Sequence, residues 1–460
     1  MDKKINHILQ KPLYPYFYGL AFIAFKSSQY FPSFSLLSAV NSLFLFCISC
    51  YIINWLISKF SRSAYTGISI LLIWGSLLHV VGVALILGYH YSYIPIGYYV
   101  TFYLVVSGII IVVQFISSKT PAQYAPSLNK LMNFFLLICS IVFVVNGFVY
   151  GGWKKETNRK PLQTAYKQVD TVKRKDILWI LVDEYASSAS LQQQFAFHNP
   201  LDSVLKEQGF CVLPAIKSRF NNTLFSLNAI FGEDDSTKPS GFYSGVRLLR
   251  KNSWVPLLET AGYQIVNLGF FDIGKHTKLA NRSGYPETYI DQLLSGTLFS
   301  IVYNSLKYTP EKCDRYNQEV LHRLDDTLFT HAGRPKFIWA HIGLPHEPFC
   351  RNSHGDFSND RTYDESDADD IKKSYTEYLQ YGNSVIIGLL KNHPDLSQKI
   401  VIISGDHGPR FSFLKDKSYQ KWPFAAVHLP GKFDTAALRN LQYISQLPDF
   451  IMDYLSPHSN

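Results

Sequence analysis

The hydrophobic pattern divides the chain near residue 150. Before that point, four long stretches are almost entirely apolar: about Leu36–Ser58, Tyr65–Gly88, Tyr93–Ile116 and Leu131–Tyr150. Each can cross the roughly 30 Å hydrocarbon layer of a membrane as a helix. An earlier run, Leu13–Phe25, is shorter and contains Pro15. It spans only if the flanking lysines, Lys11 and Lys26, extend to the interface. Residues 1–150 are therefore expected to form a transmembrane bundle of about five helices.

After residue 175, short strand-like runs alternate with helical stretches. The strand-like runs are Ile177–Val182, Tyr263–Leu268, Lys336–Ala340, Ile400–Ser404 and Phe424–Leu429. Helices are expected near Leu201–Gln208, Val246–Thr260, Tyr316–Phe329 and Ile371–Leu390. Such alternation predicts one α/β domain at 176–455 with a doubly wound, mostly parallel sheet. The polar and basic segment 151–175 is expected to be a linker near the membrane surface.

Charge is distributed unevenly between the two halves. Residues 1–150 hold eight bases and one acid, whereas the other 310 residues hold 36 bases and 34 acids. The second half therefore offers no basic excess for binding a nucleic acid, and we expect no nucleic-acid partner. With five spans, seven of the eight bases lie on the side of the N-terminus, which favours a cytoplasmic N-terminus. The protein is then expected to be a multi-pass protein of the cytoplasmic membrane. An odd number of spans places its α/β domain outside the cytoplasm.

Three strand-like runs end directly before side chains that can bind a metal or transfer a proton. These are Asp183 with Glu184, His341 with His346 further on, and Asp406 with His407. The carboxyl ends of parallel strands converge on one crevice, so the three groups are expected to share a catalytic edge. An Asp oxygen beside a neutral imidazole suits Zn or Mn. A simple Asp-capped turn is the structural alternative for Asp406.

A possible nucleophile lies between the first two strands. Thr223 precedes an apolar stretch that ends at Phe231, and we expect it to open a helix. Its hydroxyl would then lie at the positive end of the helix dipole, where an anion is stabilised. A threonine is a weak nucleophile unless a metal or a base removes its proton. The structural alternative is an N-cap threonine.

Three motifs together resemble the alkaline phosphatase superfamily, in the branch of sulfatases, lipoteichoic acid synthases and phosphoethanolamine transferases. They are G-D-H-G at 405–408, H-x-x-x-x-H-x-P from His341 to Pro348, and T-x-x-S-L from Thr223 to Leu227. The resemblance covers about Asp176–Pro430 and includes a multi-span membrane anchor joined to an outer catalytic domain.

The resemblance implies a divalent metal, with Zn or Mn favoured and Mg or Ca as the alternatives. The implied ligands are Asp406, His407, the oxygen of Thr223, and an acid at either Asp183 or Glu184. It also implies that His346 contacts the phosphoryl group or protonates the leaving oxygen. His341 would be either a second such group or a buried partner.

Two departures from the family pattern bear on the substrate. Sulfatases of this superfamily carry Cys or Ser in a C/S-x-P-x-R setting, whereas this chain has Thr223, Phe225 and Leu227 at those positions. Classical sulfatase activity is therefore not expected. Phosphoethanolamine transferases usually carry a further histidine soon after G-D-H-G, whereas this chain has Arg410. Its guanidinium can clamp a phosphoryl or sulfuryl oxygen.

The favoured hypothesis is metal-dependent transfer of a phosphoryl-type group, of the phosphoethanolamine or phosphoglycerol class, through a Thr223 intermediate. The donor would be a membrane lipid and the acceptor an envelope glycan or lipid. One alternative is a phosphodiester or sulfate-ester hydrolase of the same fold. Another is a non-catalytic protein of envelope polymer assembly.

Several other residues have weaker motif context. Asp272 and His276 have the spacing of a two-metal site, but a loop salt bridge is the simpler interpretation. The outer domain holds three cysteines, which allow one disulfide without selecting it: Cys211, Cys313 and Cys350. Five histidines without motif context are expected at the surface: His198, His322, His331, His354 and His393.

Overall fold

The computed structural model describes most of the chain. The described residues are 3–28, 36–60, 65–86, 96–149, 174–232, 239, 242–278, 289–294, 296–299, 309–330, 333–357, 367–414, 416–431, 433 and 435–456. The chain forms two compact units, one of Met1–Asn158 with Gly284–Lys307, the other of Arg159–Ser283 with Tyr308–Asn460. Of the expected linker at 151–175, all but residues 174 and 175 lie outside the described residues.

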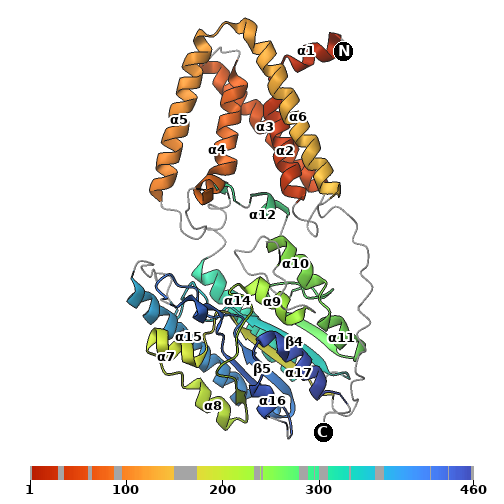
Figure 1. Cartoon of the computed structure of the whole chain (residues 1–460), viewed down its shortest axis with the longest axis vertical. Helices are drawn as coiled ribbons and strands as arrows, with labels where there is room; N and C mark the ends of the chain where they lie inside the picture. The colour runs from red at the N-terminus through yellow and green to blue at the C-terminus, as the bar shows by residue number, and fades with distance from the viewer. Residues whose placement is uncertain are drawn as a thin grey trace. The chain divides into compact units, whose positions relative to one another are not determined.

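The regular elements of the first unit, within the residues that the structure describes, are all helices (Figure 1). Its helices are α1 (Lys3–Leu9), α2 (Tyr14–Ser28), α3 (Leu36–Phe60), α4 (Thr66–Ile86), α5 (Ile96–Lys119), the 3-10 helix η1 (Ala122–Tyr124) and α6 (Ala125–Val149). All five expected apolar runs are helices. Pro15 does not break α2, because it lies in the first turn, where the missing N–H costs no helical hydrogen bond.

Two stretches have the length and composition of a membrane span, Leu36–Lys59 and Ala122–Asn146. Thr66–Val81 and Val100–Ile116 are shorter apolar helices, so a five-span bundle remains a prediction. The long helices expose large apolar side chains, among them Leu37 (71%), Leu104 (69%) and Leu131 (66%). Water is a poor environment for so much apolar surface, whereas hydrocarbon is a good one.

A segment distant in sequence completes the helical unit. It contains α12 (Tyr289–Leu294) and residues 296–299, and no pattern in the sequence predicted it. Leu293 is buried in one apolar cluster with Phe22 and Phe46. The ring of Phe299 lies 6.3 Å from that of Trp74. Part of the chain beyond residue 280 therefore shares the core of the N-terminal helices.

The second unit is built on a six-stranded sheet in the order β2-β6-β5-β1-β4-β3. The strands are β1 (Ile177–Val182), β2 (Cys211–Val212), β3 (Gln264–Leu268), β4 (Lys336–Ile342), β5 (Ile400–Ser404) and β6 (Ala425–His428). β1 pairs in parallel with β4 and β5, and β3 pairs in parallel with β4. β6 is antiparallel to both of its neighbours, β5 and β2. The expected doubly wound, mostly parallel sheet is confirmed.

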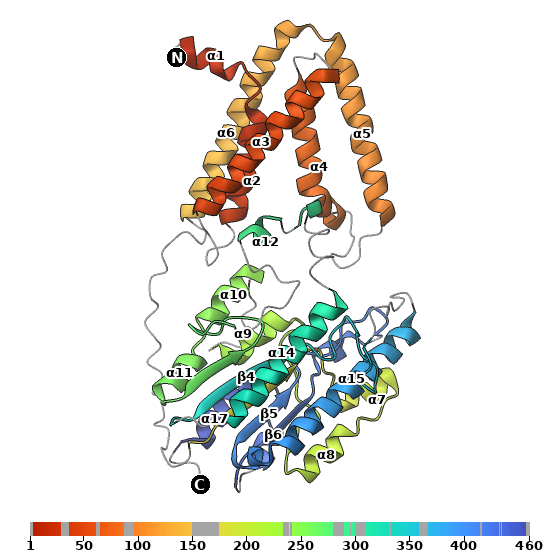
Figure 2. The same cartoon turned by 180° about the vertical axis from the view of Figure 1, so that it is seen from behind.

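Helices cover both faces of this sheet. On one face, α9 (Thr223–Phe231) and α11 (Trp254–Thr260) contribute aromatic rings to the core. Phe231 lies 4.7 Å from Trp339, and Trp254 lies 4.9 Å from Phe337, between ring centroids. The other face is covered by α14 (Pro310–Phe329) and α15 (Ala368–Asn392), as Figure 2 shows.

Smaller elements complete the unit. They are α7 (Ser188–Phe195), α8 (Leu201–Glu207), α10 (Phe242–Arg250), α16 (Thr435–Arg439), α17 (Leu447–Tyr454) and the 3-10 helices η2 (Pro394–Gln398), η3 (Lys417–Lys421) and η4 (Ile444–Gln446).

Two expected boundaries are wrong. The single helix expected at Val246–Thr260 is two helices, because Asn252 accepts a hydrogen bond from Val255 N at 2.8 Å and donates one to Leu249 O at 2.7 Å. That pair of bonds ends α10 and starts α11. The strand expected to end at Ala340 continues to Ile342, since its last residues still pair with β1. His341 therefore lies inside β4 rather than after it.

Candidate active site

Asp406 and His407 are held in the turn that follows β5. Both side chains are fully buried. The flanking glycines are needed because other backbone passes close by. A Cβ at Gly405 would lie 2.5 Å from the carbonyl oxygen of Tyr185, and one at Gly408 would collide with the carbonyl of Tyr419. The G-D-H-G motif is thus a tightly packed turn that positions the Asp406 carboxylate and the His407 imidazole in the interior.

Asp183 and Glu184 follow β1, and their side chains have different surroundings. Glu184 has φ of 60°, the left-handed region that a side chain with a Cβ rarely adopts. Its N–H donates to Asp406 Oδ1 at 3.0 Å, and its carbonyl accepts from the Tyr375 hydroxyl at 2.8 Å. These bonds hold the turn. Sequence reasoning missed Tyr375, since nothing distinguishes it from the other aromatic residues of an amphipathic helix.

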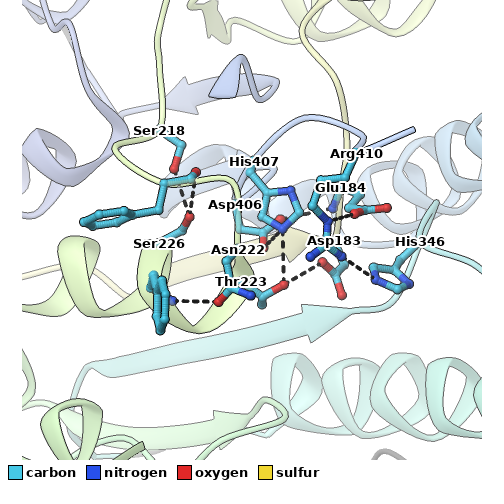
Figure 3. Close-up of polar contacts among 12 residues, drawn as sticks. Asp183, Glu184, Ser218, Asn222, Thr223, Ser226, His346, Asp406, His407 and Arg410 are labelled. Atoms are coloured by element: carbon cyan, nitrogen blue, oxygen red, sulfur yellow. Dashed lines mark hydrogen bonds and ion pairs between the residues drawn. The ribbon is translucent and has the colours of Figure 1, made fainter. Parts of the chain in front are cut away.

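Thr223 is the first residue of α9, as expected, but it does not cap the helix. The cap is Asn222, whose side chain accepts from Phe225 N at 3.3 Å. The Thr223 hydroxyl instead donates to Asp183 Oδ1 at 3.3 Å and lies 3.3 Å from His407 Nε2 (Figure 3). The helix N-terminus therefore presents this buried hydroxyl to the strand edge.

Together these side chains form a buried cluster. The ligand atoms of Asp183, Asp406 and His407 all lie within 4.8 Å of one another. His407 Nδ1 donates to the carbonyl of Gly408 at 2.8 Å, which leaves the Nε2 lone pair directed at the cluster. Thr223 completes the group.

The cluster fits a divalent cation. Asp406 Oδ2 accepts no hydrogen bond from the part of the chain that the structure describes, although it lies 3.2 Å from His407 Nε2. Burial raises the pKa of Asp406 above its usual value, and the neighbouring charge of Asp183 acts in the same direction. The carboxylates of Asp183 and Asp406, whose oxygens lie within 4.8 Å of each other, repel each other, and a bound cation would remove that cost.

Glu184, Arg410 and His346 form a second group on the outer side of the cluster. Arg410 Nε donates to Glu184 Oε1 at 2.6 Å, and its Nη2 donates to His346 Nε2 at 3.2 Å (Figure 3). Burial alone would raise the pKa of Glu184, but the positive charge of Arg410, with smaller contributions from His346 and His407, lowers it. The side chain of Arg410 is 37% exposed, whereas that of Glu184 is 5% exposed.

His341 lies behind the cluster rather than at its mouth. It is fully buried, and its Nε2 lies 3.8 Å from Asp183 Oδ2. Its ring stacks on Phe270 at 3.7 Å between centroids, and its carbonyl accepts from the Tyr316 hydroxyl at 2.9 Å. Of the two arrangements considered from the sequence, the geometry favours a buried partner of Asp183.

The remaining polar residues that the sequence singled out take separate partners. Asp272 forms an ion pair with Arg250, whereas His276 Nε2 lies 2.7 Å from Glu259 Oε1. Each therefore contacts a partner of its own. The expectation that His393 lies at the surface is wrong: it is 2% exposed, with Nε2 2.6 Å from an oxygen of Asp325.

A family model described as Sulfatase matches residues 231–431. The match covers His341, His346, Asp406, His407 and Arg410, but it begins after Asp183, Glu184 and all but the last residue of α9. It confirms the sulfatase-like resemblance inferred from the motifs. No curated protein matches the sequence.

Several solved structures are similar to this chain at low sequence identity. The integral membrane lipooligosaccharide phosphoethanolamine transferase A of Neisseria meningitidis has 12% identity and a TM-score of 0.45, over 94% of this chain and 94% of that one. The periplasmic domain of a phosphoethanolamine transferase from Campylobacter jejuni has 16% identity and a TM-score of 0.39, over 62% and 95%. A lipoteichoic acid synthase of Listeria monocytogenes has 14% identity and a TM-score of 0.39, over 63% and 75%.

Proposed function

We propose that this chain, whose α/β unit is a sulfatase-like domain, is a metal-dependent transferase that carries a phosphoryl-type group on Thr223. The observation that supports this most strongly is the position of the Thr223 hydroxyl. It lies 3.3 Å from both Asp183 Oδ1 and His407 Nε2, at the N-terminus of a nine-residue helix. A buried hydroxyl in that position is within reach of the groups that can activate it.

Asp183, Asp406 and His407 would hold the metal, with Thr223 Oγ1 beside them. Two carboxylates and one imidazole suit Zn or Mn better than Mg or Ca, which prefer oxygen ligands alone. Bound there, a divalent cation withdraws charge from the phosphoryl oxygens and favours the alkoxide form of threonine. Glu184 is left out of this ligand set because its carboxylate is paired with Arg410.

In the first half-reaction, Thr223 Oγ1 forms a bond to phosphorus and the bond between phosphorus and the leaving alcohol breaks. The proton lost by Thr223 ends on that alcohol. In the second half-reaction, an acceptor hydroxyl forms a bond to the same phosphorus, the bond between phosphorus and Thr223 Oγ1 breaks, and the acceptor's proton ends on Thr223. We assign the transfer of these protons to the half-buried His346. Its Nδ1 donates to the carbonyl of Glu347 at 2.6 Å, so Nε2, which accepts from Arg410, is the atom that would carry the proton.

Arg410 is placed to bind the transferred group. Its Nε is anchored on Glu184, so the guanidinium is oriented before a substrate arrives. The rest of the guanidinium is partly exposed and can donate to a phosphoryl oxygen. His341 has no such exposure, and we assign it the task of positioning Asp183.

The donor in this proposal is a membrane phospholipid, and the acceptor is an envelope glycan or lipid. The helical unit supports a lipid donor, because its exposed apolar side chains suit contact with hydrocarbon. The excess of bases on one side of the expected spans supports an extracytoplasmic α/β unit. A group of the phosphoethanolamine or phosphoglycerol class would then be transferred at the outer face of the cytoplasmic membrane.

The test uses purified full-length protein with head-group-labelled phospholipid and candidate glycans. We expect label in a glycan product, and a mass increase on the Thr223 peptide when the acceptor is withheld. A chelator should abolish both signals, and added Zn or Mn should restore them. Labelled head group released to water, with no modified glycan, would instead identify a hydrolase of the same fold. Bound metal without any turnover would contradict both enzymatic proposals.

A further inference from the structure

Two cysteines of the α/β unit lie on segments that meet beside Tyr378. Cys350 Sγ is 3.1 Å from the Tyr378 hydroxyl oxygen, and Asn317 Nδ2 donates to the same oxygen at 3.3 Å. Cys313 is four residues before Asn317 in α14, so it lies on the same helix face, about 6 Å away along the axis. Both cysteines are buried, Cys350 completely and Cys313 to 6% exposure.

An ion pair joins the residues that directly follow these cysteines. Arg351 donates to Asp314 through Nε at 2.6 Å and through Nη2 at 2.7 Å. Two parallel bonds of this kind fix distance and orientation. The residue after Cys313 is therefore fastened to the residue after Cys350.

A third bond fastens the same loop to α14. Gly343 N donates to Asn317 Oδ1 at 2.8 Å. The loop from Gly343 to Arg351 is thus held to the first turns of α14 at both of its ends and beside Tyr378. Both cysteines are in the thiol form in the structure, and these bonds hold together the two segments that carry them. Close approach of two tethered segments is what a disulfide needs in order to close without large movement.

We propose that Cys313 and Cys350 form a disulfide in the mature protein. Each thiol gives up one proton and one electron, an Sγ–Sγ bond forms, and a disulfide-bearing oxidant is reduced to two thiols. The inference rests on the extracytoplasmic location proposed above, because disulfides persist in oxidising compartments.

Cys211 is the cysteine left over. It lies in β2, at one edge of the sheet, whereas α14 packs on β3 and β4 at the opposite edge. The fold therefore selects one pair among the three that the sequence allowed.

The disulfide would fix the loop that carries His346 against α14. Burial raises the pKa of the Cys350 thiol to about 12, so a reactive thiolate is rare once the protein has folded. The bond would then form during folding, and the buried disulfide would resist reductants until the protein unfolds.

The main test measures the state of the cysteines in full-length protein taken directly from cells. The protein is quenched in acid, denatured, and alkylated with N-ethylmaleimide before and after reduction. We expect Cys313 and Cys350 to be alkylated only after reduction, as one joined peptide pair, and Cys211 to be alkylated in both samples. Alkylation of Cys313 and Cys350 without reduction would overturn the inference.

Variants give the matched control. In C313S the thiol of Cys350 should become alkylated without reduction, and in C350S that of Cys313 should, whereas C211S should leave the joined peptide pair unchanged. A joined pair that includes Cys211 in the unsubstituted protein would also overturn the inference.

A second experiment tests separately whether the two cysteines are close enough to join and whether the α/β unit lies in an oxidising compartment. Protein that has been unfolded in reductant is refolded with oxidised glutathione. If the pair is absent in cells but joins here, the proposed location is wrong; if it joins in neither, the geometry is wrong. Both readouts are peptide masses, so they do not depend on whether the chain transfers a phosphoryl group.

Discussion

Two groups of polar side chains lie next to each other in the α/β unit, and they are built in opposite ways. The inner group, Asp183, Thr223, Asp406 and His407, is buried and comes from three separate turns. The outer group, Glu184, His346 and Arg410, is hydrogen bonded internally, and two of its three members reach solvent.

The boundary between these groups passes between two consecutive residues, Asp183 and Glu184. Glu184 has a positive φ, and its carboxylate pairs with Arg410, whereas the Asp183 carboxylate accepts from Thr223. The comparison teaches that the inner group is suited to a cation and a nucleophile, whereas the outer group is suited to substrate charge and protons. The predictions below test that division, beginning with the largest effect.

Thr223→Ala should reduce turnover by on the order of 10⁴-fold, because it removes the atom that forms the covalent bond. The labelled peptide should disappear as well. Thr327→Ala provides the matched control, since that hydroxyl bonds the carbonyl of Arg323 in its own helix. Normal activity of the Thr223 variant would exclude a threonine intermediate.

Asp183→Asn and Glu184→Gln should separate the two neighbouring acids. The Asp183 variant should lose most of its bound metal, and its activity with it, because the carboxylate contributes charge to the buried cluster. The Glu184 variant should keep the metal but lose activity about tenfold, because Arg410 becomes less ordered. A loss of that size corresponds to roughly one hydrogen bond to a charged group. Elemental analysis of the purified protein measures the bound metal in each variant. Equal metal loss in both variants would contradict the separate roles of the inner and outer groups.

His346→Gln should reduce turnover by roughly 10²- to 10⁴-fold, the range for loss of a general acid–base group. Bound metal should not change. A donor with a strongly acidic leaving group should recover much of the first half-reaction, because that leaving group needs no proton. His322→Gln, an exposed position on α14, serves as the control. A loss of equal size with the activated donor would argue against proton transfer.

Arg410→Lys should reduce turnover about 10- to 100-fold, somewhat less than loss of a whole oxyanion donor. Lysine keeps the charge but cannot bond Glu184 and a phosphoryl oxygen with one planar group. Arg323→Lys, at an exposed helix position, is the matched control. A raised KM or a lowered kcat would both fit the role, whereas unchanged kinetics would remove Arg410 from the site.

The elements that carry the inner group could be predicted because burial leaves a clear pattern in the sequence. The run Ile177–Val182 is buried at every position and is a strand with the bounds expected. Ile400–Ser404 is likewise fully buried and ends at the expected turn. Helix α9 begins at Thr223, as its apolar stretch indicated.

The division between Asp183 and Glu184 could not be predicted. It depends on one backbone angle and on the partner that Arg410 reaches across 226 positions of sequence. The burial of His393 escaped prediction for the same reason, since its partner Asp325 is 68 positions away. Long-range pairs of this kind leave no local periodicity.

The assignment of α12 to the helical unit has a practical consequence for recombinant work. A fragment that starts at residue 159 would still contain Leu293 and Phe299, yet it would lack the helices that bury Leu293. Such a fragment should aggregate through this exposed apolar segment even if its sheet folds well. Replacing Gly284–Lys307 with a short polar connector is therefore the first change to make when a detergent-free catalytic fragment is wanted for crystallisation.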